Sequence, residues 1–191
     1  MARPRKFDEN ESIEQALGVF WKHGFKATTT EALLKAMGIG KGSFYATFGG
    51  KRQLFLRCLR HYCDGLANLL QSTLAEEDVR KGLASVRDIV IHSACEQRTG
   101  CLLYNTASEL SPHDKEIEQV VKNAMSRNES IYVKRFRKAQ HDGQISGNKN
   151  ATTLARYFVA CFAGLQLMGK ADPDAAARLR AVANLAIDSL V

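Results

Sequence analysis

Glycines beside a lysine are the first residues of this chain that could do chemistry. Residues 37–51 read MGIGKGSFYATFGGK, and a glycine-rich loop that ends in lysine can cradle the phosphates of a nucleotide. Such a loop follows a buried strand, whereas the pattern before Gly38 is helical. Arg52 stands where a Ser or Thr would follow the lysine, and no glycine stands five positions before Gly50. The stretch therefore argues against a nucleotide-dependent enzyme.

Cysteine and histidine are the next candidates for chemistry. Cys58, His61 and Cys63 suggest a metal site, but Cys63 lies well round the helix from Cys58, and the chain has no Cys-x-x-Cys pair. Ser-His-Asp spacings, paired carboxylates and cofactor fingerprints are missing as well. We therefore expect no catalytic residue, no metal and no cofactor, and predict that the protein is not an enzyme. A metal-responsive regulator is kept as a lesser alternative.

Composition places the chain among ordinary globular proteins. Its 191 residues are 45% hydrophobic and 25% charged, and no apolar run is long enough for a bilayer crossing. The charged N-terminus lacks the apolar core of a secretion signal. The five cysteines are odd in number and lie in helix-like, apolar segments, as reduced thiols do. We expect a cytoplasmic protein with no membrane partner.

Positive charge is concentrated in the first third of the chain. Net charge is +7, and residues 1–62 hold eleven Lys and Arg against five Asp and Glu, a balance of +6. A basic end on a nearly neutral body is typical of proteins that bind a polyanion, most often nucleic acid. A solvated basic face is the alternative that charge alone leaves open.

Helical periodicity runs almost throughout, so we expect an all-α fold of about nine helices. Asp8 and Glu11 form a start resembling a capping box, and Gly24 is placed to end the first helix. A second helix starts at Thr28 and ends at Gly38. Further helices are expected from Gly40 to Phe48, then over 51–75, 78–97, 101–110, 112–140, 150–170 and 173–190.

The glycines of 38–42 fit a helix-turn-helix. Gly38 ends one helix, a tight turn follows, and Gly40 can cap a short second helix. Ile39 and Phe44 then point to the core. The outer face of the second helix carries Lys41, Ser43, Tyr45, Ala46 and Thr47.

The segment GFKATTTEALLKAMGIGKGSFYATFGGKRQLF, residues 24–55, resembles the DNA-binding domain of the tetracycline-repressor (TetR) family. The resemblance is dense over residues 8–62, and over the C-terminal part it rests on the number and order of helices. It implies a homodimeric regulator, usually a repressor, that binds a palindromic site in double-stranded DNA and is released by a small-molecule inducer. It also implies that residues 1–50 form the DNA-binding domain, with a basic N-terminal arm, and that residues 51–191 form an effector-binding and dimerisation domain.

By this resemblance, Thr28 and Thr29 would meet a phosphate, the recognition helix would present Lys41, Gly42, Ser43 and Tyr45, and Lys51 would hold another phosphate. We add Thr47 from the outer face. Gly40, Ala46 and Thr47 depart from the usual Ser, aromatic or His residues of the family, so few long side chains reach the major groove. Arg3 and Arg5 suit a narrow minor groove, or belong to a basic tail with only diffuse attraction.

The last two expected helices are both apolar, and the one over 150–170 carries apolar residues around most of its circumference, which favours two packing surfaces. One surface would form a four-helix bundle with a second copy. The residues assigned to it are Tyr157, Phe158, Cys161, Phe162, Leu165, Leu179, Val182 and Ala186. The other reading of the same residues is intrachain core.

Cys101 follows a glycine at the start of a helix, where a thiolate is favoured. Its Gly-Cys-Leu context resembles a branch of the TetR family that senses electrophiles or oxidants, and that resemblance places Lys170 near the sulfur. The alternative is a buried cysteine in a repressor with a noncovalent apolar-ligand pocket. The basic run 134–138 reads best as the solvated face of a long helix with Phe136 turned inward.

Overall fold

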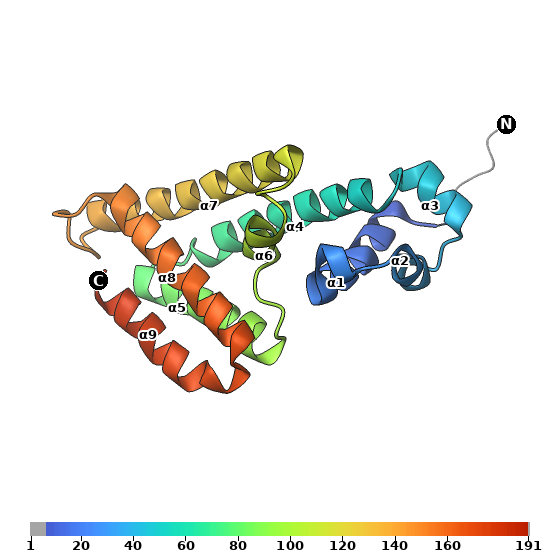
Figure 1. Cartoon of the computed structure of the whole chain (residues 1–191). Helices are drawn as coiled ribbons and strands as arrows, with labels where there is room; N and C mark the ends of the chain where they lie inside the picture. The colour runs from blue at the N-terminus through green and yellow to red at the C-terminus, as the bar shows by residue number, and fades with distance from the viewer. Residues whose placement is uncertain (1–6, 191) are drawn as a thin grey trace. The chain divides into compact units, whose positions relative to one another are not determined.

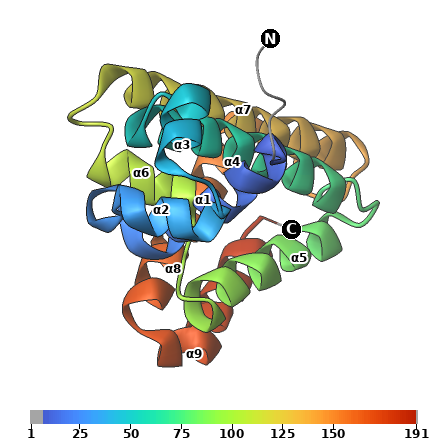
Figure 2. The ribbon, with the colours of Figure 1, turned by 90° about the vertical axis from the view of Figure 1, so that its right-hand side faces the viewer.

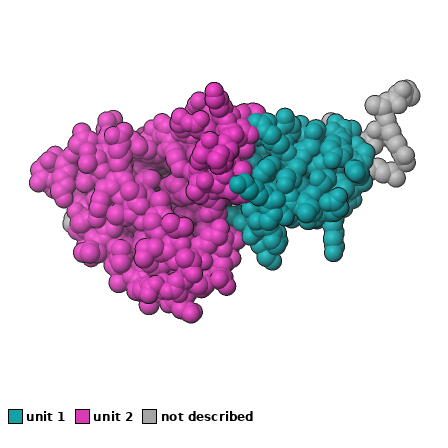
Figure 3. Space-filling model, viewed as in Figure 1, with its two compact units in different colours: residues 1–63 teal, residues 64–191 magenta. Residues whose placement is uncertain are grey.

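The computed structural model describes residues 7–190, which form nine α-helices and no β-strand (Figure 1). This confirms the all-α fold and the number of helices expected. The described chain divides into an N-terminal unit, residues 1–63, and a C-terminal unit, residues 64–191 (Figure 3). The division falls inside helix α4 (Lys51–Thr73), whose residues 51–63 belong to the N-terminal unit.

The N-terminal unit contains α1 (Glu9–Ala27), α2 (Thr30–Met37) and α3 (Lys41–Phe48). Asp8 caps α1, since its carboxylate accepts from the backbone N–H groups of Asn10 and Glu11. Gly24 interrupts the helical geometry of α1 with a φ of 77°, one turn before the helix ends. The small core is aromatic: the ring of Phe55 lies 5.0 Å from those of both Phe20 and Phe25.

The C-terminal unit contains α5 (Val79–Ile91), α6 (Leu102–Glu109), α7 (Lys115–His141), α8 (Ala151–Ala171) and α9 (Ala176–Asp188). Helix α8 packs against α5, α7 and α9, which places it at the centre of this unit (Figures 1 and 2). Its buried residues include Phe158 and Phe162, whose stacked rings are 4.0 Å apart.

The boundaries of α5 and α7 differ from the sequence-based expectation. The helix expected over 78–97 is α-helical only to Ile91, continues as a π-helical turn over His92–Glu96, and ends where Arg98 and Gly100 adopt φ values of 57° and 62°. The helix expected to open at Pro112 begins at Lys115 instead. The carboxylate of Asp114 accepts from the N–H groups of Glu116 and Ile117 and so provides the better cap.

Helix α8 is long and apolar enough to cross a membrane by length and composition, and among the described residues no other helix passes that test. The central helix of a protein core meets the same criteria. Seven residues of α8 are buried against the helices around it, which is the pattern of a core helix.

Candidate DNA-binding surface and effector region

The turn between α2 and α3 is built on a left-handed glycine. Gly38 has φ 62° and ψ 25°, and its N–H donates to the carbonyl of Leu34. A residue with a Cβ would be strained there, whereas glycine is not. Gly40 follows in an extended conformation and is the N-cap of α3. The turn thus redirects the chain within three residues and fixes the start of α3.

Helix α3 buries two aromatic residues and exposes a polar face. Phe44 and Phe48 are buried, whereas Lys41, Gly42, Ser43, Tyr45 and Ala46 are exposed and Thr47 is half-buried. No side chain caps the first N–H groups of α3, so they are free to donate to a phosphate. A Cβ at Gly42 would meet nothing within 4 Å, so a backbone could approach closely there.

Thr28 and Thr29 are placed differently from each other. Thr28 is 2% exposed and its hydroxyl donates to the carbonyl of Gly24 at 2.6 Å, so it stabilises the end of α1 and cannot present that hydroxyl to DNA. Thr29 is exposed, and its hydroxyl oxygen caps α2 by accepting from the N–H of Ala32. The expected phosphate contact at Thr28 is therefore corrected, and only Thr29 lies at the surface.

Lys51 also has an internal task. Its ammonium donates to the carbonyls of Phe25 at 2.9 Å and Thr28 at 2.7 Å, and lies 4.5 Å from the centre of the Phe25 ring. These contacts hold the end of α1 against the start of α4. Two of the three ammonium N–H groups are thus committed within the protein, so the simple picture of a lysine that only binds a phosphate is corrected.

Replacing Lys51 with methionine should therefore destabilise the N-terminal unit as well as weaken DNA binding. The change keeps much of the alkyl length and leaves two carbonyls without their charged donor, for which we expect a loss of about 1.5–3 kcal/mol. Urea unfolding followed by the fluorescence of Trp21, the single tryptophan, would measure it. An unchanged unfolding midpoint would show that the two hydrogen bonds contribute nothing to stability.

Arg57 on α4 is a contributor that sequence reasoning missed. Its guanidinium donates to the carbonyl of Thr47 in the last turn of α3, pairs with the carboxylate of Glu9, and lies 5.4 Å from the centre of the Phe48 ring. It thereby ties the recognition helix to α1 and α4. A charged residue on an amphipathic helix looks like any solvated side chain in the sequence, so no local pattern identifies it. Arg3 and Arg5 lie outside the described residues.

The residues assigned to a dimer surface fall into two groups. Phe158, Phe162, Leu165, Leu179 and Ala186 are at most 4% exposed, because they form the core of the protomer itself. Tyr157 and Val182 are 44% and 52% exposed, and Cys161 is half-buried. The large apolar side chains that α8 and α9 do expose also include Leu167, Met168 and Leu185, so the proposed contact surface moves to this outer face.

The cysteine expected to sense an inducer is buried. Cys101 is 4% exposed and occupies the N-cap position of α6, and its side chain does not cap the helix. Lys170 lies close to the preceding residue, since its Cδ is 3.6 Å from the position a Cβ on Gly100 would take. Lys170 is exposed. The structure thus brings the end of α8 close to Gly100, the residue before Cys101. A role for Lys170 beside the sulfur stays a prediction.

Two tyrosines share the surroundings of this cysteine. Burial raises the pKa of Tyr104 on α6 and of Tyr132 on α7, and the charge that Cys101 can carry raises both pKa values further. The rings therefore stay protonated at neutral pH, within electrostatic range of the sulfur. Sequence reasoning missed both, because a tyrosine on an amphipathic helix is indistinguishable from any other core residue.

The three residues considered for a metal do not assemble into a site. The Cys58 thiol is buried and donates to the carbonyl of Ile13 at 3.5 Å, and burial raises its pKa to about 12. His61 pairs with Glu14 at the surface, and Cys63 is buried. Over residues 7–190, no group of three or more His, Cys, Asp or Glu side chains is arranged to hold a metal ion.

A left-handed glycine turn that leads into a short helix with an exposed polar face is the geometry of a helix-turn-helix motif, which is typical of DNA-binding proteins. Residues 13–58 match the family described as bacterial regulatory proteins, tetR family, and residues 83–185 match the tetracyclin repressor-like C-terminal domain. The chain belongs to the TetR family of bacterial transcriptional regulators.

Relatives are similar over nearly the whole chain. The HTH-type transcriptional regulator YezE of Bacillus subtilis is 26% identical over 91% of this chain and 92% of its own. The HTH-type transcriptional repressor ComR of Escherichia coli is 27% identical over 88% of this chain and 82% of its own. A solved cysteine mutant of the regulator CifR, in complex with 26-bp double-strand operator DNA, is 26% identical with a TM-score of 0.84 and covers 98% of this chain and 99% of that one.

Proposed function

We propose that the protein is a homodimeric transcriptional repressor of the cytoplasm that binds a palindromic operator and leaves it when an inducer acts on the C-terminal part. The observation that carries this proposal is the exposed face of α3, held by the Gly38 turn and by Arg57. Related proteins named as repressors, and CifR bound to operator DNA, support the same reading. In this proposal residues 1–50 bind DNA, and 51–191 receive the inducer and dimerise.

Two identical helix-turn-helix units on one duplex require a two-fold relation between them, and therefore a site with two inverted half-sites. Phosphate contacts position such a dimer, and base contacts specify the sequence. Phosphate contacts would come from the uncapped start of α3, from Thr29, and from Lys41 and Lys51. Tyr45 and Ser43 are the exposed α3 side chains best suited to supply base contacts. Ala46 offers only a methyl group.

Changing Lys41 and Tyr45 should have distinct effects on DNA binding. Lys41→Ala should weaken binding to operator and unrelated DNA alike, and lower the slope of log affinity against log salt by about one. Tyr45→Ala should weaken operator binding about ten- to a hundredfold and unrelated DNA much less. Fluorescence anisotropy over a salt series would measure both, with Lys122→Ala on α7 as the control.

Genome-wide mapping of bound sites would supply the operator for these measurements. A protein that lacks residues 1–50 and still protects the mapped site would refute the assignment of DNA binding to this region. A bound site without inverted half-sites would refute the two-fold arrangement. Expression of the adjoining genes in a strain without the protein tests repression, since it should rise.

Two kinds of inducer are compatible with the C-terminal unit. The position of Cys101 at the start of α6, directly after Gly100 and with Lys170 near that glycine, favours a small electrophile or oxidant that modifies the thiol. Burial of Cys101 favours the alternative, in which a noncovalent apolar ligand occupies the helical interior. The thiol hypothesis is tested in the Discussion.

A further inference from the structure

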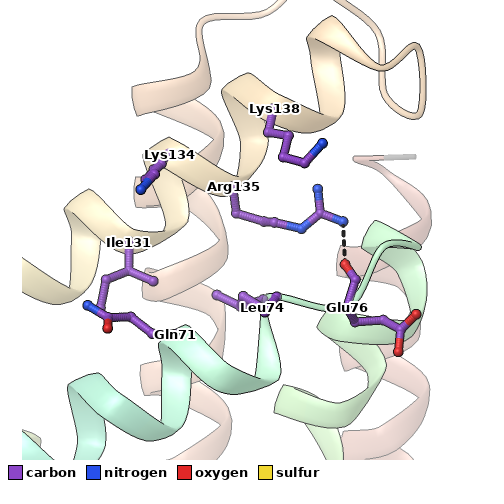
Figure 4. Close-up of a pocket in the computed structure, with 8 residues that line it drawn as sticks. Gln71, Leu74, Glu76, Ile131, Lys134, Arg135 and Lys138 are labelled. Carbon is purple, nitrogen blue, oxygen red and sulfur yellow. Dashed lines mark hydrogen bonds between the residues drawn. The ribbon is translucent and has the colours of Figure 1, made fainter.

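A cavity of about 430 Å³ opens between the end of α4 and the second half of α7, within the C-terminal unit. This size suits a small organic molecule better than a lone inorganic ion. Three cationic side chains come from α7, and apolar atoms come from both sides (Figure 4). The lining residues are Gln71, Leu74, Ala75, Glu76, Ile131, Lys134, Arg135 and Lys138.

Arg135 is a buried guanidinium with unused donors. The residue is only 7% exposed, and its Nη2 donates to the carbonyls of Glu76 and Glu77, each at 3.0 Å. Its Nε and Nη1 are buried and make no hydrogen bond to any part of the chain that the structure describes. Buried polar groups are almost always paired, because an unpaired one loses its hydration without compensation. The Nε and Nη1 groups of Arg135 are therefore donors without an acceptor among the described residues.

Two lysines place further positive charge at the same cavity. In Figure 4 the Lys138 ammonium lies on the side of the Arg135 guanidinium opposite the Glu76 carbonyl, and Lys134 lies one helical turn from Lys138. The Glu76 carboxylate is directed away from the guanidinium (Figure 4). Lys138 pairs with Asp142, but its side chain is 66% exposed, so it can move toward a ligand at little cost. The local charge favours an anion.

The remaining wall is apolar. Leu74 at the end of α4 is buried, Ile131 on α7 is half-buried, and Ala75 adds a methyl group. An inorganic anion would leave this wall in contact with water, whereas an acid with a hydrocarbon body would cover it. Arginine is the side chain that most strongly pairs with carboxylates and phosphates.

We propose that this cavity is a binding site for a small amphipathic organic anion, whose carboxylate or phosphate head accepts from Arg135 and Lys138 while its apolar body covers Leu74 and Ile131. The site is independent of the Cys101 region and of the operator. The basic run 134–138, expected from sequence to be a solvated helix face, is in this proposal the cationic wall of the site.

The test uses the full-length dimer in the absence of DNA. Octanoate and octyl phosphate are the amphipathic anions, hexan-1-ol is the neutral probe, and inorganic phosphate is the head group alone. Isothermal titration should show saturable binding of at least one amphipathic anion, and the ¹⁵N–¹H signal of the Arg135 side-chain Nε should shift on binding. Whichever of the two anions binds more tightly identifies the head group.

The double variant Lys134→Gln and Lys138→Gln should weaken that binding at least tenfold, because it removes two of the three positive charges at the cavity. Both side chains are exposed, so we expect the variant to fold. Arg137→Gln is the matched control, an exposed cation on the same helix that does not line the cavity. Equal binding by the double variant and the control would overturn the proposal. So would equal binding of hexan-1-ol, equal binding of inorganic phosphate, or no saturable binding at millimolar concentration. Operator affinity is a separate measurement. The proposed DNA-binding function therefore stands or falls independently of the ligand results.

Discussion

Replacing Leu185 with aspartate should convert the dimer to monomers and lower operator affinity about 10²- to 10⁴-fold. The change in affinity follows because the second half-site is then no longer bound in an intramolecular step. Leu185 is 69% exposed in the protomer, so the aspartate costs little in folding. In a dimer, the same carboxylate would have to lose its water among apolar side chains without a cationic partner.

The outer face of α8 and α9 supports this expectation. Tyr157, Cys161, Gly164 and Met168 follow one another at spacings of four, three and four residues, so they form one stripe along α8. A Cβ at Gly164 would meet nothing within 4 Å, which leaves room for close approach of a second helix. Val182 and Leu185 extend the apolar surface on α9, with 52% and 69% exposed. Monomeric proteins rarely leave a contiguous surface of this kind uncovered.

Sedimentation velocity at micromolar concentration would measure the assembly, and an operator gel shift would measure the affinity. Leu69→Asp is the matched control, because Leu69 is also an exposed leucine of the C-terminal unit, 43% exposed, but lies on α4. We expect this control to remain dimeric. A dimeric Leu185→Asp protein would remove the outer face of α8 and α9 from the interface.

Local patterns predicted the elements better than the contacts between them. Gly38 and Phe44 could be placed from sequence because a glycine that ends a helix and an aromatic residue four positions after Gly40 have local meaning. The tasks of Thr28 and Lys51 could not, because the lysine meets carbonyls 23 and 26 positions away in the chain. The start of α7 was misplaced because Ser111-Pro112 and Asp114 both form plausible caps, and the carboxylate formed the hydrogen bonds.

The dimer surface shows the same limit on a larger scale. Helix α8 is apolar on nearly all sides, so periodicity predicted two packing surfaces without saying which residues face inward. Packing against α5, α7 and α9 decides that Phe158 and Phe162 belong to the core and Tyr157 to the exterior. Arg135 is a similar case, since only the fold shows that one cation of a basic run is buried while Lys134 and Lys138 are exposed.

The thiol hypothesis rests on the surroundings of Cys101. Its sulfur lies within electrostatic range of Tyr104 and Tyr132, and Lys170 lies against Gly100. Arg98, three residues before Cys101, has a φ of 57°, a left-handed conformation that is uncommon for a residue with a side chain. Because Cys101 is 4% exposed, we expect a substituent as large as a quinone ring on its sulfur to displace neighbouring residues and move the 98–102 segment.

Cys101→Ser should therefore abolish release from the operator by p-benzoquinone, while the wild-type protein is released. The thiolate of Cys101 adds to a ring carbon of the quinone, forming a carbon–sulfur bond as the carbon–carbon double bond is lost, and the ring takes up the proton. Cys95→Ser is the matched control: Cys95 is a second buried cysteine of the C-terminal unit, 5% exposed, and its loss should leave the response unchanged. Operator anisotropy during quinone addition, with mass spectrometry of the adduct, would measure both.

Equal release of wild type and Cys101→Ser would exclude Cys101 as the sensor. If both proteins stay on the operator during quinone addition and a noncovalent apolar ligand releases them instead, the pocket mechanism is favoured. Cys101 would then be a buried core residue and not a sensor.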